Sequence, residues 1–363
     1  MVKRVRLQDV QKEASQDFAA EDDTGGAYYD PPKGNLQVIP TGSRLLDCVV
    51  GPVYGGGWVL GRISNIVGDK STGKTLLAIE ACANFARLYD GPIYYREAEA
   101  AFDKDYAANL GLPLDRVAFG EENGPIETVE DMIEDLMQTL ATQEKSGSPG
   151  LYILDSLDAL SDRDEMDPKI DKKTGEIKGS YGTAKAKGMS RMFRQLVRRL
   201  ERTKTHVMII SQIRDNIGVT FGRKTKRSGG HALDFYASQV VYLAVVSHLD
   251  KTIQKVKRDI GVLVKAKCDK NKVGTPFRVC EFPIMFGYGI DDLHANLLWL
   301  HEIGRLAEAG AGADLNKALA TYAALSDDDY RACVQDVGDM VVRIWNEVED
   351  RFRPKRSKYG DPQ

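Results

Sequence analysis

Residues Gly68-Asp69-Lys70-Ser71-Thr72-Gly73-Lys74-Thr75 match the pattern G-x-x-x-x-G-K-[ST] of a phosphate-binding loop. The glycines let backbone N–H groups wrap a triphosphate, because no Cβ atom stands in the way. In this pattern Lys74 places its charge on the β- and γ-phosphates, and the Thr75 hydroxyl reaches Mg²⁺. The flanking residues are typical of a buried strand (62–67) and of a helix (76–83) that starts at the phosphates. The sequence therefore predicts a nucleotide and Mg²⁺ site here rather than an ordinary glycine-rich turn.

The composition is that of a globular protein of the reducing cytoplasm. The chain has 363 residues, of which 42% are hydrophobic and 28% are charged. It has no apolar run near the roughly 20 residues that cross a membrane, and its basic N-terminus lacks the apolar stretch of a signal peptide. The five cysteines are scattered and form no C-x-x-C pair, which argues against disulfides and zinc. We expect a cytoplasmic protein without a membrane partner.

Charge is concentrated in one part of the chain. Between Tyr181 and Arg227 there are 13 Lys or Arg residues and 2 Asp or Glu residues, whereas the whole chain has a net charge of −3. A basic segment in an acidic body is typical of a protein that binds a polyanion such as nucleic acid. A solvated helix face is the alternative.

The order of the predicted elements indicates an α/β fold. Strands are predicted at 92–95, 151–155, 206–211, 240–246 and 262–267, with helices between several of them. Such alternation predicts a mostly parallel twisted sheet covered on both faces. We expect three parts: an N-terminal helix and linker for subunit contact (1–36), an ATPase core (37–295), and a small helical C-terminal domain with a basic tail (296–363).

Carboxylates follow two of the predicted strands. Asp155 ends the apolar stretch 151–155, where phosphate-loop proteins hold the shell of Mg²⁺. Glu97 and Glu99 follow the strand 92–95, and either could orient or deprotonate an attacking water. The spacing does not choose between them, and favourable charge at a helix N-terminus is an alternative role.

A basic, glycine-rich loop follows the strand 206–211. Gln212 stands at its start, where an amide could sense the γ-phosphate. The loop carries Arg214, Arg223 and Lys224, and it suits a segment that binds a phosphate backbone. A surface linker without function is the alternative.

Four segments together resemble the RecA family of DNA strand-exchange proteins. Residues 210–222 and 228–238 resemble the second DNA-binding loop of the family and the element after it, and residues 40–47 resemble the entry to its core. Residues 97–103 resemble the segment with the catalytic glutamate, which selects Glu99. The resemblance spans about 41–291 and implies a RecA-like phosphate-loop ATPase core.

The resemblance also implies roles for individual residues. Asp103 corresponds to a contact with adenine, and Tyr106 to a tyrosine that stacks on it. Lys270 and Lys272 correspond to a lysine pair that reaches the ATP of the neighbouring subunit, and Phe235 to an aromatic residue that inserts into that subunit. The DNA-contacting positions, including the loop residues above, are Lys187, Ser190, Arg194, Arg214, Ile217, Arg223, Lys224, Gly229, Gly230 and His231.

The resemblance implies an ATP-dependent recombinase that forms helical homo-oligomeric filaments on single-stranded DNA. Such a protein pairs that strand with homologous duplex DNA, hydrolyses ATP at subunit interfaces with Mg²⁺, and works with single-strand-binding and loader proteins. The segment 155–187 is longer than in most bacterial members, and the tail 351–358 is basic, which would suit a phage-encoded relative in an infected host.

Two alternatives share the same core motifs. A hexameric ring helicase has this fold, but its family usually has an arginine finger in place of the lysine pair. A nucleotide-dependent scaffold without catalysis would require Glu99 to be silent, which the complete set of catalytic positions argues against.

Overall fold

The computed structural model describes residues 36–52, 56–99, 102–120, 126–161, 196–215, 225–227, 233, 235–310 and 312–354. All of these residues belong to one compact unit that begins at Leu36. The predicted N-terminal helix and the extreme C-terminal tail lie outside the described residues. The predicted domain boundaries therefore stay predictions.

The unit is built from strands and helices in alternation over its first half and from antiparallel strands and helices over its second. The strands are β1 (Val38–Ile39), β2 (Trp58–Val59), β3 (Ile63–Gly68), β4 (Ile93–Glu97), β5 (Val117–Ala118), β6 (Gly150–Asp155), β7 (Thr205–Asp215), β8 (Thr225–Arg227), β9 (Gln239–Ile253), β10 (Val256–Asn271), β11 (Val279–Met285) and β12 (Gly289–Ile290). The helices are α2 (Arg44–Val50), α3 (Lys74–Leu88), α4 (Lys104–Asn109), α5 (Val129–Ser146), α9 (Asp292–Glu302), α10 (Leu315–Ala323) and α11 (Asp327–Phe352), with short 3₁₀ turns η1 (Leu114–Arg116), η3 (Leu157–Ala159) and η4 (Leu306–Ala309).

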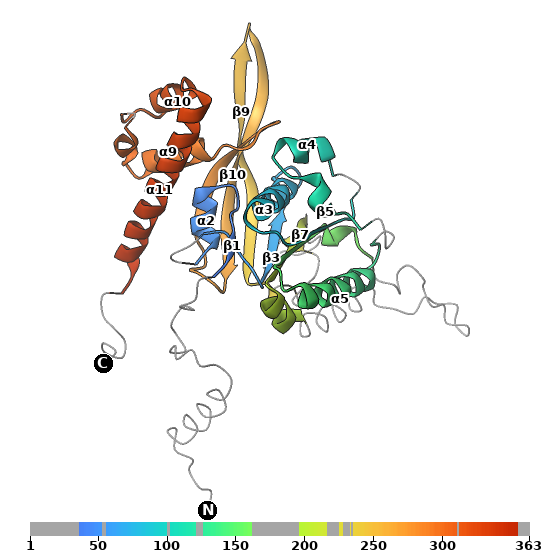
Figure 1. Cartoon of the computed structure of the whole chain (residues 1–363). Coiled ribbons are helices and arrows are strands. Elements are labelled where there is room, and N and C mark those ends of the chain that lie inside the picture. Colours follow the sequence, from blue (N-terminus) through green and yellow to red (C-terminus); the bar gives the residue numbers. More distant parts are fainter. Residues whose placement is uncertain are drawn as a thin grey trace, which may run out of the picture. The chain divides into compact units, whose positions relative to one another are not determined.

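A ten-stranded sheet organises the unit, in the order β12-β11-β10-β9-β3-β7-β6-β4-β5, with β8 paired to β7. Strands β9, β3, β7, β6, β4 and β5 pair in parallel. Strands β10, β11 and β12 continue the sheet antiparallel. The predicted α/β class with a mostly parallel sheet is confirmed, and Figure 1 shows α3 and α5 packed along this sheet.

Alternate residues of the central strands pack into two separate hydrophobic clusters, because successive side chains of a strand point to opposite faces. On β6, Leu151 and Ile153 join a cluster with α3, whereas Tyr152 and Leu154 join a second cluster with α5. The buried Leu196 extends the second cluster from the described helical residues 196–203. The sheet is therefore covered on both faces, as the sequence predicts.

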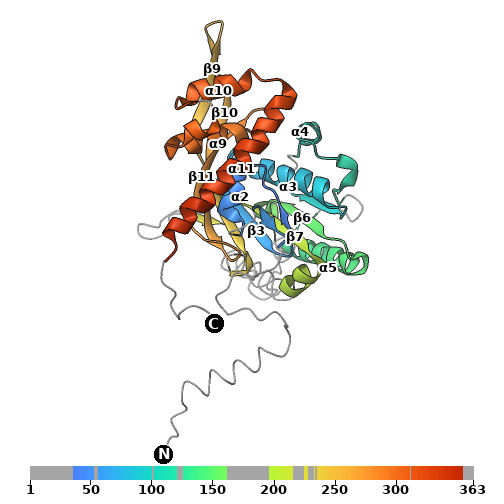
Figure 2. The ribbon, with the colours of Figure 1, turned by 60° about the vertical axis from the view of Figure 1, so that its left-hand side comes forward.

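The C-terminal helices share the first of these clusters with the core. Val341 and Ile344 of α11 are buried together with Leu46 of α2 and Leu297 of α9. The start of α11 is capped by Ser326, whose side chain accepts the N–H of Asp329. Figure 2 shows α11 running beside α2 and β11.

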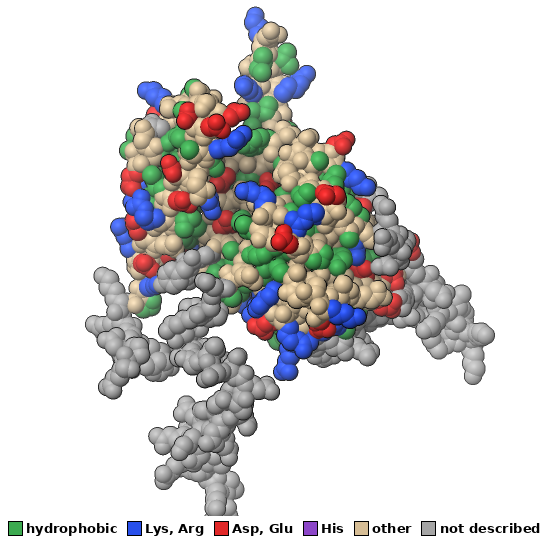
Figure 3. All heavy atoms as spheres, viewed as in Figure 1, with side chains coloured by type: hydrophobic (Ala, Val, Ile, Leu, Met, Phe, Trp, Pro, Cys, Tyr) green, Lys and Arg blue, Asp and Glu red, His purple; other side chains and the backbone are tan. Residues whose placement is uncertain are grey.

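The hairpin of β9 and β10 is longer than the sequence predicts. The two strands continue past the predicted 240–246 and 262–267 into a projecting arm with exposed residues such as Val246 and Val256. Gln254 and Lys255 turn the chain at its tip with positive φ angles of 50° and 67°. Figure 3 shows Lys and Arg side chains along this arm. This part of the two strands was not predicted from the sequence, because neither face of the arm is buried and its residues therefore show no hydrophobic pattern.

Strand β7 also exceeds its prediction. It extends beyond 206–211 to Asp215, so Gln212 and Arg214 lie on the strand rather than in a following loop. The extension is paired, because Ile213 lies opposite Arg227 of β8. Part of the predicted glycine-rich loop is thus a strand. In the part of the chain that the structure describes, no helix is long and apolar enough to cross a membrane.

Candidate functional site

The phosphate loop joins β3 to α3 with the geometry that a triphosphate needs. Gly73 has a positive φ of 88°, which only glycine adopts without strain, and α3 begins at the next residue. A Cβ at Gly68 would meet the Thr72 hydroxyl at 2.5 Å, so this position also requires glycine. The Lys74 ammonium folds back to donate to the Asp69 carbonyl at 2.7 Å. Two further residues of the loop, Lys70 and Ser71, are exposed in the turn between β3 and α3.

The fit to phosphate rests on the helix start. Among the described residues, no side chain caps the N-terminus of α3, where backbone N–H groups and the helix dipole favour an anion. Burial lowers the pKa of Lys74, and the charges of Asp155 and Glu99 act in the opposite direction. The loop residues therefore fit a nucleoside triphosphate.

Oxygen atoms that suit Mg²⁺ gather beside the loop. The Thr75 hydroxyl donates to Asp155 Oδ2 at 2.8 Å, and the Tyr95 hydroxyl donates to the same oxygen at 2.9 Å. Burial raises the pKa of Asp155, whereas these two hydrogen bonds lower it. Hydroxyl and carboxylate oxygens are the ligands that Mg²⁺ prefers, so Thr75 and Asp155 fit the ion.

The structure separates the two glutamates that spacing leaves open. The Glu99 carboxylate accepts hydrogen bonds from the Ser156 hydroxyl and, at 2.8 Å, from the Gln212 side-chain amide. Glu97 lies opposite Asp155 in the sheet, and its carboxylate accepts the backbone N–H of Glu99 at 3.0 Å. Glu99 is thus the glutamate that shares its carboxylate with the predicted phosphate sensor.

Three residues of this network were not predicted from the sequence. Tyr95 and Ser156 contact Asp155 and Glu99 directly, and Asp158 accepts the backbone N–H of Gln212. Ser156 could have been found, since it follows Asp155 directly. The other two have no local signal, because their contacts form only when β4, β6 and β7 lie side by side.

The predicted adenine contacts lie at the start of α4. Asp103 is the N-cap of this helix, and its carboxylate accepts the backbone N–H of Tyr106 at 2.9 Å. Tyr106 is half-buried against the core, and burial raises the pKa of its hydroxyl.

The three predicted subunit contacts form one cluster. The ammonium groups of Lys270 and Lys272 both donate to the carbonyl of Phe235, at 2.8 and 3.0 Å. The Phe235 ring is 66% exposed, and the Lys272 ammonium lies 5.4 Å from its centre. An exposed aromatic ring beside two cations is an unusual surface for a monomer and suits a contact with another chain.

The cluster and the phosphate loop lie at opposite edges of the sheet. We call the edge where β3, β4, β6 and β7 end the carboxyl edge, and the opposite one the amino edge. Lys270 lies opposite Val240 and Asn271 opposite Gln239, which in turn pairs with Ser64 near the start of β3. From Ser64 to the end of β3 the chain climbs about 13 Å, at about 3.3 Å per residue. The lysine pair and the phosphate loop of one chain therefore face different ways.

Most of the predicted DNA contacts fall outside the described residues. These are Lys187, Ser190, Arg194, Ile217, Arg223, Lys224, Gly229, Gly230 and His231. The backbone of Arg214 lies on β7, two residues beyond Gln212.

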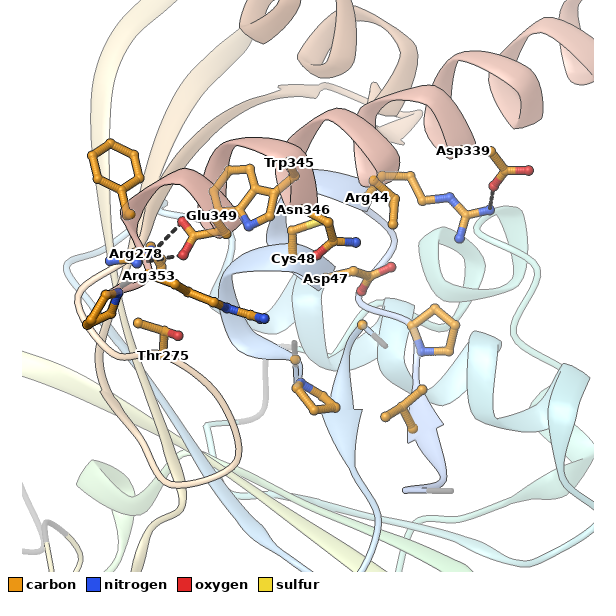
Figure 4. Close-up of a pocket in the computed structure, with 18 residues that line it drawn as sticks. Arg44, Asp47, Cys48, Thr275, Arg278, Asp339, Trp345, Asn346, Glu349 and Arg353 are labelled. Carbon is orange, nitrogen blue, oxygen red and sulfur yellow. Dashed lines mark hydrogen bonds and ion pairs between the residues drawn. The ribbon is translucent and has the colours of Figure 1, made fainter. Parts of the chain in front are cut away.

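A cavity of about 450 Å³ lies elsewhere, between α2 and α11 (Figure 4). An ion pair between Arg278 and Glu349 and the ring of Trp345 line it, together with Cys48. Its lining includes none of the phosphate-loop residues, so it is separate from the nucleotide site.

Comparison with known proteins gives consistent matches. The model of the RecA N-terminal domain matches residues 27–291. The chain is 36% identical over 261 residues to Protein RecA of Paenarthrobacter aurescens strain TC1, which covers 72% of this chain and 69% of that protein. It is 34% identical over 306 residues to Protein RecA of Bacteroides thetaiotaomicron, covering 83% of each chain. For Protein RecA of a Nocardioides strain the identity is 32% over 333 residues, covering 90% of this chain and 85% of that protein.

Proposed function

This chain belongs to the RecA family, and we propose that it is an ATP-dependent DNA recombinase. In this proposal the protein forms helical filaments on single-stranded DNA, pairs that strand with homologous duplex DNA, and hydrolyses ATP at subunit interfaces. The duplex, single-strand-binding proteins and loader proteins are its proposed partners.

One observation carries the proposal: the residues for ATP chemistry are divided between the two edges of the sheet. The carboxyl edge holds the phosphate loop, Asp155 and Glu99, whereas Lys270 and Lys272 lie at the amino edge. The two lysines therefore do not lie at the phosphate loop of their own chain. Head-to-tail stacking of copies would bring one chain's amino edge to the next chain's carboxyl edge. A heterologous contact of this kind builds filaments or rings.

The proposed roles follow from the positions. ATP with Mg²⁺, when bound, would supply the γ-phosphoryl group and the divalent charge that offsets the phosphates. Lys74 and the start of α3 bind phosphate, while Thr75 and Asp155 hold the metal. Glu99 orients and deprotonates a water, as general bases do. Lys270 and Lys272 of the neighbouring copy stabilise transition-state charge.

Gln212 is the proposed sensor of the γ-phosphate. Its amide rests on Glu99, and its strand continues toward the predicted DNA loop. A change at the γ-phosphate can therefore reach DNA through one strand, and DNA affinity should depend on the nucleotide. The DNA contacts themselves should be largely to the phosphate backbone and sensitive to salt.

Electron microscopy tests the proposal against the ring helicase. The purified protein is imaged with long single-stranded DNA and a slowly hydrolysed ATP analogue, and again without nucleotide. Continuous helical filaments that require the nucleotide support the recombinase, and a strand-exchange assay then follows. Closed rings would favour the helicase, and DNA without bound protein would reject both.

A further inference from the structure

We propose that Asp158 is a positioning residue that fastens the end of β7 to the nucleotide site and so couples ATP to DNA. Its carboxylate accepts the backbone N–H of Gln212 at 2.6 Å. The inference rests on the proposed function, because it concerns how the same site communicates with DNA.

The hydrogen bond from Gln212 to Asp158 takes the place of pairing with β6, which has already ended at this point of β7. The β6–β7 ladder stops where Leu154 lies opposite Ile209, before the chain turns into η3. Beyond that point β7 continues beside β3, with Gln212 opposite Gly68. A backbone N–H that loses its partner strand needs another acceptor, and Asp158 of η3 provides one. A hydrogen bond to a carboxylate is stronger than a neutral one.

With the Asp158 contact, both the side chain and the main chain of Gln212 are held by hydrogen bonds. The Gln212 side chain donates to Glu99 at 2.8 Å while its main chain donates to Asp158. Glu99 is in turn bound by the Ser156 hydroxyl, two residues before Asp158. The turn after β6 therefore holds the proposed water-activating glutamate and the proposed sensor in one arrangement.

These contacts lie where β7 leads into the predicted DNA-binding segment. From Gln212, β7 continues to Asp215, and β8 returns at Thr225–Arg227 opposite Ile213. The predicted DNA-binding residues 216–224 connect these two strands in the sequence. In this proposal Asp158 holds the Gln212 backbone in place. A movement of the Gln212 side chain at the γ-phosphate then changes the position of the following residues of β7 and of the predicted DNA loop. Without the Asp158 contact the main chain can move independently and the signal is lost.

Two substitutions separate this role from simple charge. Asp158→Ala removes the acceptor, whereas Asp158→Asn keeps an oxygen that can accept the N–H and removes only the charge. The Asp158 charge also acts on Lys74, so a purely electrostatic role would affect both variants alike. Glu201→Ala is the control, since this glutamate pairs with Arg62 at the surface.

The first measurement is the ratio of ATP hydrolysis with and without single-stranded DNA. We expect Asp158→Ala to lower the ratio about tenfold, as the loss of a hydrogen bond implies. Asp158→Asn should lose clearly less, because it keeps a neutral hydrogen bond, and the control should keep the full ratio. The second is amide hydrogen exchange of the Gln212 backbone, which should be faster only in Asp158→Ala.

The outcomes distinguish the inference from the proposed function. Wild-type protein whose hydrolysis ignores DNA would reject both. Wild-type protein that responds to DNA, with an equal response in Asp158→Ala, would overturn the inference alone. Equal losses in Asp158→Ala and Asp158→Asn would also overturn it, because charge rather than the hydrogen bond would be responsible.

Discussion

The carboxyl and amino edges of the sheet divide one proposed reaction between them. At the carboxyl edge the polar groups bind one another: Thr75 and Tyr95 share Asp155, and Gln212 shares Glu99 with Ser156. At the amino edge the ammonium groups of Lys270 and Lys272 both donate to the backbone carbonyl of Phe235, beside its exposed ring. The first edge is pre-organised by its own chain, whereas the second presents charge outward. This difference favours the proposal that the amino edge contacts another copy of the chain.

The largest expected effect on ATP hydrolysis comes from a substitution that disables the phosphate loop at the carboxyl edge. Lys74→Ala should reduce ATP hydrolysis about a thousandfold, because it takes away the charge that faces the phosphates. Nucleotide binding, followed with a fluorescent ATP analogue, should fall with it. Lys70→Ala is the matched control in the same loop and should retain activity. Normal turnover in Lys74→Ala would mean that the loop is not the nucleotide site.

A mixing experiment tests whether the edges act between copies. Glu99→Gln disables the carboxyl edge, and the double variant Lys270→Ala/Lys272→Ala disables the amino edge. Each alone should lose about a hundredfold in hydrolysis. In an equal mixture on DNA, roughly a quarter of the interfaces pair two intact edges, so activity should return in part.

The mixture has a decisive negative result. If it hydrolyses no faster than the sum of its parts, the lysines do not act in the neighbour's site. The control mixes each variant with Lys74→Ala protein that also lacks Lys270 and Lys272, which offers neither edge and should restore nothing.

The sequence predicted the two edges unequally. The residues of the carboxyl edge could be predicted from local sequence patterns, because the phosphate loop and Asp155 each come directly at the end of an apolar strand. The contact of Lys270 with Phe235 depends on the pairing of β9 with β10, and no local pattern predicts it. The family resemblance indicated a subunit contact for each residue, but not that the two lie together. Tyr95 and Asp158 were missed for the same reason. A tyrosine in a strand reads as core, and an aspartate in a turn reads as a surface residue, until the neighbouring strands are in place.

A smaller effect is expected from the aromatic ring of the amino edge. Phe235→Ala should raise the protein concentration needed for filament assembly about tenfold, as the loss of a central aromatic contact implies. Light scattering on single-stranded DNA measures this threshold. Phe352→Ala is the control, because this ring is also exposed, at 76%, but lies at the end of α11. An equal shift in both variants would indicate a general loss of solubility instead.

The smallest effect concerns the support beneath the amino edge. The carbonyl of Val50, at the end of α2, accepts hydrogen bonds from Gln239 at 2.7 Å and Asn271 at 3.0 Å. In the same helix burial raises the pKa of Asp47 from 3.8 to about 7, against the lowering effect of its hydrogen bonds to Thr41. The folded protein therefore holds a proton that the unfolded chain releases.

This difference fixes the sign of a pH dependence. The stability that Asp47 contributes is full below pH 3.8 and is lost as the pH rises through about 7. Raising the pH from about 6 to about 8 should thus lower the free energy of unfolding by about 1.4 kcal/mol through this group. Asp47→Asn keeps an oxygen for the Thr41 N–H but cannot ionise, so its denaturant unfolding should show that much less pH dependence. An unchanged pH dependence would mean that Asp47 is ionised in the folded protein, and the amino edge would then rest on a charged helix rather than a neutral one.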